Sequence, residues 1–222
     1  MSSAPKINND PAWRIPTWFP DIPADQQAVL KTFMSELLKA NKTTNLLPPK
    51  TVPVADQVHF ADSILGARQI MKSGYPVKKI WDLGSGSGFP GIVFAVLFPS
   101  VEVHLIDSDQ RKAEFLKQVV ATLKLSNVVV HNQAIEKLGP NSVEFAVCRG
   151  FHELTKTMMM MRSIVQPGGV IFHMKSDVWG LELSRVPAQL CSIWDTGLVG
   201  NYELPETGIS FAIVKTLRIA GS

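Results

Sequence analysis

Residues 80–91 read IWDLGSGSGFPG, a glycine-rich stretch with an acidic residue near its start. Gly84, Gly86 and Gly88 alternate, and Asp82 stands two residues before the first of them. Glycine allows a backbone to turn sharply and to approach a ligand closely. The stretch therefore predicts a ligand-binding loop, and its ligand could be a dinucleotide, a nucleotide phosphate or a nucleoside without phosphates.

A second acidic residue narrows the choice of ligand. Asp107 ends a predicted strand at residues 101–107 and follows Gly84 by roughly the 20 residues expected of a nucleoside site. At that position a carboxylate can accept hydrogen bonds from the two hydroxyls of a ribose. The glycines could also be plain turn-formers, but Asp82 and Asp107 fall in register with them and favour a nucleoside.

Two phosphate-binding alternatives fit the loop less well. Gly86, Gly88 and Gly91 form a G-x-G-x-x-G, the pattern of dinucleotide sites. In that register two extra residues separate the strand from the first glycine, and Asp82 would repel a pyrophosphate. A P-loop is excluded, because no Lys-Ser or Lys-Thr follows the glycines. A ligand with a ribose, a cationic amino acid and no phosphate is S-adenosylmethionine (AdoMet), which the pattern favours over NAD(P).

From residue 78 onward, the sequence pattern predicts strands that alternate with helices. We predict strands at residues 78–83, 101–107, 128–134, 143–149 and 168–175, helices at 90–98, 111–125 and 151–165, and two more strands within 191–219. This βαβα order is typical of an α/β fold with a parallel sheet and helices on both faces. The ligand then binds at the carboxyl ends of the strands.

The chain before the first strand differs in texture. Residues 1–23 hold five prolines and two tryptophans and predict an irregular arm. Residues 24–75 predict a small helical cap of two amphipathic helices, at 23–42 and 54–71. The ligand-binding domain would then span residues 76–222.

Composition bounds the class of protein. The 222 residues are 45% hydrophobic and 18% charged, with a net charge of +3. A sizeable core is therefore expected, and a nucleic-acid partner is permitted but not required. Cys148 and Cys191 make no disulfide framework and suit a reducing cytoplasm. We find no membrane-spanning run, no secretory signal and no zinc spacing, so we expect neither a membrane nor a metal.

The glycine loop, the acid after the second strand and the PGG turn before the fifth strand resemble class I AdoMet-dependent methyltransferases. The resemblance implies a Rossmann-like fold with a mostly parallel seven-stranded sheet and an antiparallel end strand. The predicted helical cap would precede that sheet. The implied cofactor is AdoMet.

Longer motifs are more specific. The stretch DLGSGSGFPGI resembles the loop D-x-G-[ST]-G-x-G-[FL]-P-G of the RsmG/GidB family, enzymes that methylate N7 of a guanosine in the 530 loop of 16S ribosomal RNA. Further matches are HFADSI through His59, Asp62 and Ser63, CRGF through Arg149, and HMKS through Lys175. Residues 41–47 and 105–116 match other family stretches, so the resemblance covers about residues 26–218.

The resemblance also implies roles for residues. Asp82, Gly84, Gly86, Gly88, Phe89, Asp107, Ile135 and Glu136 would bind the cofactor. Arg149 would order both AdoMet and the incoming base, and Lys175, His59, Asp62 and Ser63 would meet the RNA. The alternatives without a functional role are a surface salt bridge for Arg149 and a solvated lysine for Lys175. For His59, Asp62 and Ser63 the alternative is a structural polar network.

The implied reaction is simple. Guanine N7 has a free lone pair and no proton to lose, so in-line displacement needs no general base, and orientation and desolvation supply the rate. We expect a cytoplasmic monomer that acts on 16S rRNA within the small ribosomal subunit or its assembly intermediate. The rivals are a methyltransferase of small molecules or proteins, and a catalytically silent AdoMet-binding protein on the ribosome. Ala134, Ser176 and Ile209–Phe211 depart from the family pattern, and the first and third of these departures could alter RNA contacts.

Overall fold

The structure, a computed structural model, describes residues 11–220; the first ten residues of the predicted arm lie outside that range. Seven strands form one sheet in the order β3-β2-β1-β4-β5-β7-β6. Strands β1 to β5 pair in parallel, and β7, the last strand of the chain, runs antiparallel to both β5 and β6. The predicted α/β fold with a mostly parallel sheet is confirmed.

The strands match the sequence pattern closely. They are β1 (Lys79–Leu83), β2 (Glu102–Asp107), β3 (Val128–Asn132), β4 (Val143–Arg149), β5 (Val165–Ser176), β6 (Trp194–Glu203) and β7 (Ser210–Arg218). The expected turn at residues 166–169 lies inside β5, where the pairing with β4 shifts register between Val143 and Phe145. Gly168, at φ 82°, makes this irregularity possible because only glycine adopts that conformation freely.

The helices show more differences from prediction. They are α1 (Ile15–Trp18), α2 (Ala24–Asn41), α3 (Asp62–Lys72), α4 (Gly91–Leu97), α5 (Gln110–Thr122), α6 (Leu154–Met161), α7 (Trp179–Leu183) and α8 (Ala188–Cys191). The helix expected at 54–71 is instead three pieces: a 3-10 helix (Pro49–Val54), a π-helical turn (Asp56–Ala61) and α3. Wide π turns often occur at functional sites, and this one carries His59.

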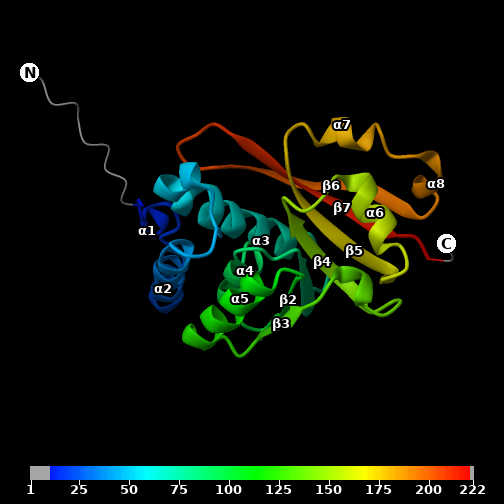
Figure 1. Cartoon of the computed structure of the whole chain (residues 1–222). Coiled ribbons are helices and arrows are strands. Elements are labelled where there is room, and N and C mark those ends of the chain that lie inside the picture. Colours follow the sequence, from blue (N-terminus) through cyan, green and yellow to red (C-terminus); the bar gives the residue numbers. More distant parts are fainter. Residues whose placement is uncertain (1–10, 221–222) are drawn as a thin grey trace, which may run out of the picture.

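The sheet separates two helical layers (Figure 1). Helices α2, α3, α4 and α5 pack on one face around a large apolar core that contains Phe33, Ile64 and Phe94. Helices α6 and α8 pack on the other face, around a second core with Trp81, Met158 and Trp194. Because β1, β2, β4 and β5 run parallel, their carboxyl ends lie at one edge of the sheet, and the candidate site residues lie there.

The described part of the proline-rich arm packs onto the body. Ile15, which is 0% exposed and begins the four-residue helix α1, and Phe19, which directly follows that helix, join the large core. The Arg14 guanidinium lies 3.0 Å from both Asp56 and Glu206, and so ties the arm to the π turn and to the loop between β6 and β7. The arm, the cap and the sheet share one apolar core. The division of the chain into residues 1–23, 24–75 and 76–222 stays a prediction. No helix within residues 11–220 is long and apolar enough to cross a membrane.

Candidate active site

The glycine loop is pinned to the neighbouring strand. The amides of Gly84 and Ser85 both donate to the Ile106 carbonyl at 3.0 Å, and Ser85 Oγ accepts from the Ile106 amide at 3.0 Å. Gly84 and Gly86 have φ values of 69° and 56°, which side chains rarely adopt. A Cβ on Gly86 would meet only the Gly84 carbonyl oxygen, at 3.8 Å, an ordinary van der Waals contact. Hydrogen bonds to β2 therefore hold the loop in place, and the Cβ position of Gly86 is free of close contacts.

Asp82 lies fully buried beneath this loop. Its Oδ2 accepts a hydrogen bond from the Gly91 amide at the start of α4, at 3.0 Å. Within residues 11–220, no group donates to its Oδ1. Burial raises the pKa of Asp82 to about 7, although the Gly91 amide and the charge of Arg149 oppose the shift. With a pKa of about 7, Asp82 is partly protonated at neutral pH.

This shift makes the stability of the protein depend on pH. Because the pKa of Asp82 rises from 3.8 to about 7 on folding, the folded state holds an extra proton between those values, and stability falls as pH rises through them. We expect the difference in unfolding free energy between the wild type and Asp82→Asn to change by about 1 kcal/mol per pH unit over that window. Urea unfolding from pH 4 to 8 measures it. A difference that does not vary with pH would contradict the assigned proton.

Asp107 ends β2, as predicted, and faces the loop. Its Oδ2 accepts from the Gly86 amide at 2.8 Å and its Oδ1 from the Asp109 amide at 2.9 Å. Carboxylate oxygens keep further lone pairs, so hydroxyl groups of a ligand can still bind. Gly84, Asp107, Ile135 and Glu136 line a small cavity of about 90 Å³. Four of the predicted cofactor residues therefore meet around one hollow.

Arg149 ends β4 and joins three groups from the π turn and α3. Its Nη1 donates to the Val58 carbonyl and to Asp62 Oδ2, both at 3.0 Å, and its Nη2 lies 3.1 Å from His59 Nδ1. Tyr202 donates to the other Asp62 oxygen at 2.7 Å. The Arg149 side chain is 20% exposed and that of Asp62 is 6% exposed. This network fixes the guanidinium at the edge of the sheet and leaves part of it open.

The contact with Arg149 decides the protonation of His59. Arginine has no acceptor, so Nδ1 of His59 must be the unprotonated nitrogen. Nε2 then carries the proton and donates to Thr51 Oγ1 at 3.1 Å. Burial, followed by the charge of Arg149, lowers the pKa of His59 to about 3, so the ring is neutral at physiological pH. His59 also stacks on Phe89, with ring centroids 5.3 Å apart.

Lys175 lies near the end of β5 and is already paired. Its ammonium group donates to Glu182 Oε2 at 2.7 Å and to the His152 carbonyl at 2.9 Å. Glu182 also accepts from the Leu154 amide at the start of α6, at 2.9 Å. Lys175 can therefore contact a phosphate only if Glu182 shares it or moves.

A wide cavity of about 640 Å³ brings the predicted substrate residues together. His59, Asp62, Arg149 and Lys175 line it, beside Phe151 and the β6–β7 loop. Ser63 does not line it, because its side chain is fully buried in α3. Three of the predicted cofactor residues, Asp82, Gly88 and Phe89, are packed against other side chains and line neither cavity. The Arg149 guanidinium lies 5.3 Å from the centre of the Phe89 ring.

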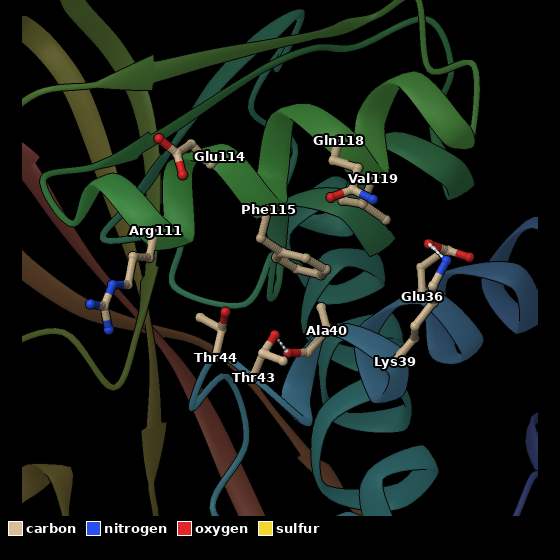
Figure 2. A pocket seen from close by; sticks show the side chains of 10 residues that line it. All are labelled: Glu36, Lys39, Ala40, Thr43, Thr44, Arg111, Glu114, Phe115, Gln118 and Val119. Atoms are coloured by element: carbon tan, nitrogen blue, oxygen red, sulfur yellow. Dashed lines mark hydrogen bonds and ion pairs between the residues drawn. The ribbon is translucent and has the colours of Figure 1, made fainter.

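A further groove of about 460 Å³ lies between α2 and α5, apart from these residues. Figure 2 shows Phe115 and Val119 of α5 facing the end of α2, with Thr43 and Thr44 beside them. Its cations, Lys39 and Arg111, are matched by Glu36 and Glu114, so the groove has no clear charge preference. It is hollow but lacks the groups that the predicted chemistry needs.

Sequence reasoning missed several partners in the site. Tyr202, Glu182 and Thr51 hold Asp62, Lys175 and His59 respectively, yet no motif marks them. Phe151 was inside the matched stretch CRGF and could have been singled out from it. Within residues 11–220, no group of three or more His, Cys, Asp or Glu side chains is placed to hold a metal ion.

The strand order, the glycine loop after β1 and the acid at the end of β2 define a class I AdoMet-dependent methyltransferase. A solved SAM-dependent methyltransferase from Aquifex aeolicus is similar in fold, with a TM-score of 0.58 and 15% identity over 78% of this chain and all of that one. A tRNA (m1A58) methyltransferase from the same organism has a TM-score of 0.53 at 13% identity, covering 72% of this chain and 68% of that one. At these identities the likeness concerns the fold alone.

Within that class, the chain belongs to the GidB family, rRNA small subunit methyltransferase G, whose sequence model matches residues 26–192. A ribosomal RNA small subunit methyltransferase G 3 from Bdellovibrio bacteriovorus is 51% identical over 208 residues, 94% of each chain. A ribosomal RNA small subunit methyltransferase G from Cellvibrio japonicus is 32% identical over 68% of this chain and 69% of its own. The family resemblance noted in the motifs is confirmed.

Proposed function

We propose that this protein transfers a methyl group from AdoMet to N7 of a guanosine in 16S rRNA, in the 530-loop region. One observation carries the proposal: a small cavity beside Asp107 shares the Phe151 side chain with a wide cavity that Arg149 and Lys175 line. The first would receive part of a nucleoside cofactor, and the second is roomy enough for a base on an RNA loop. Family membership supports the same reaction.

The residues present fit AdoMet. Gly86 leaves open the space that a Cβ would fill, Asp82 keeps a buried carboxylate oxygen free within the described chain, and Asp107 can receive ribose hydroxyls. Ile135 and Glu136 follow β3 where an adenine would lie, and their backbone can contact its edge. Gly84, Gly88 and Phe89 shape the loop around the methionine end.

AdoMet, when bound, supplies a methyl group whose bond to sulfur breaks as the N7 lone pair forms the new bond, with the released electron pair staying on sulfur. N7 has no proton to lose, so the chain needs no general base. The neutral ring of His59, with its lowered pKa, would in any case be a poor base. The residues of the site therefore act by holding the two partners in line and by excluding water.

On the acceptor side we assign two cations. Arg149 is held by Asp62 and His59 and presents its exposed part to the wide cavity, where it would order the cofactor and the base. Lys175 would contact an RNA phosphate in exchange for Glu182; such contacts position a substrate without reading sequence. Ser63 is fully buried, which argues against a contact with RNA, and its Oγ has no hydrogen-bond partner among residues 11–220, which argues against a role in the polar network.

Asp107 should control cofactor affinity. In Asp107→Ala the loop amide of Gly86 loses its acceptor, and a bound ribose would lose two hydrogen bonds, each worth about 0.5–1.5 kcal/mol, more when the acceptor is charged. We expect AdoMet to bind about 10- to 100-fold more weakly, as measured by calorimetry. Lys117→Ala on the outer part of α5 is the matched control. Unchanged affinity in Asp107→Ala would contradict the assigned ribose contact.

The substrate class can be tested against its rivals in one assay. Purified protein, methyl-labelled AdoMet and small ribosomal subunits that lack native N7-methylguanosine are incubated together, and RNA and protein fractions are counted separately. We expect the label in the RNA. Label in ribosomal proteins would favour a protein methyltransferase, and AdoMet binding without transfer would favour the silent ribosome-associated protein. Parallel reactions with naked 16S rRNA and with assembly intermediates would identify the form that the enzyme accepts.

We further propose that the protein works in the cytoplasm as a monomer. Its ribosomal RNA substrate would be reached there. Ile209 and Phe211, which depart from the family pattern, place apolar side chains on the wall of the wide cavity. Contacts with the RNA at that wall would therefore be apolar.

A further inference from the structure

The side chain of Phe151 lies at the junction of the two cavities. It lines the small cavity beside Asp107 and also the wide cavity beside Arg149 and Lys175. Among the described residues that line either cavity, Phe151 is the one that both have in common. The Phe151 ring is therefore placed to contact both a ligand in the small cavity and a ligand in the wide one.

Local backbone geometry puts the ring there. Gly150, directly after β4, has a φ of 58°, which turns the chain back toward the glycine loop. The Phe151 ring then rests on Gly84: its Cδ2 and Cε2 atoms lie 2.6 and 3.1 Å from the position that a Cβ on Gly84 would take. On its other side the ring contacts His152, with centroids 4.2 Å apart. Apart from Gly150 and its two chain neighbours, no described residue has a heavy atom within 4 Å of the Cβ position of Gly150, so nothing packs against the turn on that side.

The proposed reaction places demands on this junction. The accepting nitrogen must come to about 3–3.5 Å from the methyl carbon before transfer, and in line with the breaking bond. The target base must therefore lie against the boundary between the two cavities. A base drawn out of an RNA loop has lost its stacking neighbours, and aromatic side chains commonly replace them. Arg149 and Lys175 supply charge near the boundary, but neither supplies an apolar face of that size.

We propose that Phe151 is the platform on which the target purine stacks during methyl transfer; this inference rests on the proposed function. In the structure the ring covers Gly84. When the methionine end of the cofactor occupies the loop, the ring turns away from Gly84 about Gly150 and presents its face to the wide cavity. The cofactor in the small cavity and the base in the wide cavity are then held next to each other, so binding of the cofactor prepares the binding site of the base.

The test compares substitutions that keep or remove the ring. Phe151→Tyr keeps an aromatic face, Phe151→Leu removes it, and Phe151→Met gives the same loss with a flexible side chain in case the leucine variant does not fold. Phe98→Leu is the matched control, since Phe98 is also partly buried but ends α4 at a different groove. For each we would measure AdoMet affinity by calorimetry, thermal unfolding, and kcat/KM for small subunits at saturating AdoMet.

We expect Phe151→Leu to lower kcat/KM for the RNA at least about tenfold while AdoMet affinity changes less than about threefold, because base–aromatic stacking is lost and cofactor contacts are kept. Phe151→Tyr and Phe98→Leu should stay near the wild type in both measurements. A merely structural role would instead lower stability and both affinities together.

Two results would overturn the inference. Wild-type kcat/KM in Phe151→Leu would show that the ring does not support the base. A loss of transfer that disappears once AdoMet is raised above a weakened dissociation constant would make the ring a lid on the cofactor instead. If the wild-type protein itself transfers no label to RNA, the proposed function fails and the inference fails with it; labelled RNA with indifferent variants would count against the inference alone.

Discussion

Arg149→Ala is expected to abolish detectable methyl transfer and to destabilise the protein. The guanidinium is the ion-pair partner of Asp62, whose side chain is 6% exposed. Removing it leaves a buried carboxylate uncompensated, which costs about 3 kcal/mol, the lower end for a broken buried ion pair. Transfer should fall at least about 100-fold, as expected when a group that orients the reacting partners is lost. Urea unfolding and a labelled-AdoMet assay measure the two effects.

A double variant separates the two effects of this substitution. Combining Arg149→Ala with Asp62→Asn removes the unpaired charge while the amide can still accept from Tyr202, so most of the stability should return. Methyl transfer should not return, because the cation at the cavity is still missing. Recovery of transfer together with stability would show that Arg149 is only a structural ion pair. Arg149→Lys should be impaired as well, since lysine cannot serve Val58, Asp62 and His59 in one plane.

Gly86→Ala is expected to remove cofactor binding while the protein stays folded. Its φ of 56° costs an alanine about 1–2 kcal/mol. The new methyl group would meet only the Gly84 carbonyl, at 3.8 Å, so the protein itself can accommodate it. The same methyl group would occupy the space beside Gly86 where we propose that AdoMet binds. We expect calorimetry to show affinity at least about 100-fold weaker, a loss of roughly 2.7 kcal/mol.

Gly91→Ala is the matched comparison in the same stretch. A Cβ there would meet the Leu105 side chain and would lie 2.6 Å from Asp82 Oδ2, inside the packed start of α4. This variant should lose stability by about 1–3 kcal/mol through overpacking, and any loss of affinity should follow from that. Equal AdoMet affinity in Gly86→Ala and the wild type would contradict the placement of the cofactor on the loop.

Much of this site could be predicted because parallel strands bring their carboxyl ends to one edge. Four of the site residues stand at or near the ends of predicted strands: Asp82, Asp107, Arg149 and Lys175. The predicted range of β4, residues 143–149, agrees with the observed strand at both its first and its last residue. The alternation of strand and helix patterns was enough to place them at the same edge.

The contacts that hold these side chains could not be predicted in the same way. Asp62 and Tyr202 are 140 residues apart, and Asp62 and Arg149 are 87 residues apart, so only the folded chain pairs them. The π turn that carries His59 follows from packing against the arm and the β6–β7 loop, and a helical pattern of apolar residues does not reveal it. The position of Phe151 over Gly84 depends on one glycine with positive φ, which sequence spacing does not disclose.

The most direct test of the central claim is to map the methyl group. Small subunits lacking native N7-methylguanosine are incubated with the protein and AdoMet, and the RNA is then reduced and cleaved with aniline, which breaks the chain at N7-methylguanosine. The proposed function predicts one new cleavage, at a guanosine of the 530 loop, that is absent with Arg149→Ala. Labelled RNA without any cleavage would place the methyl group on another atom and contradict the assigned reaction.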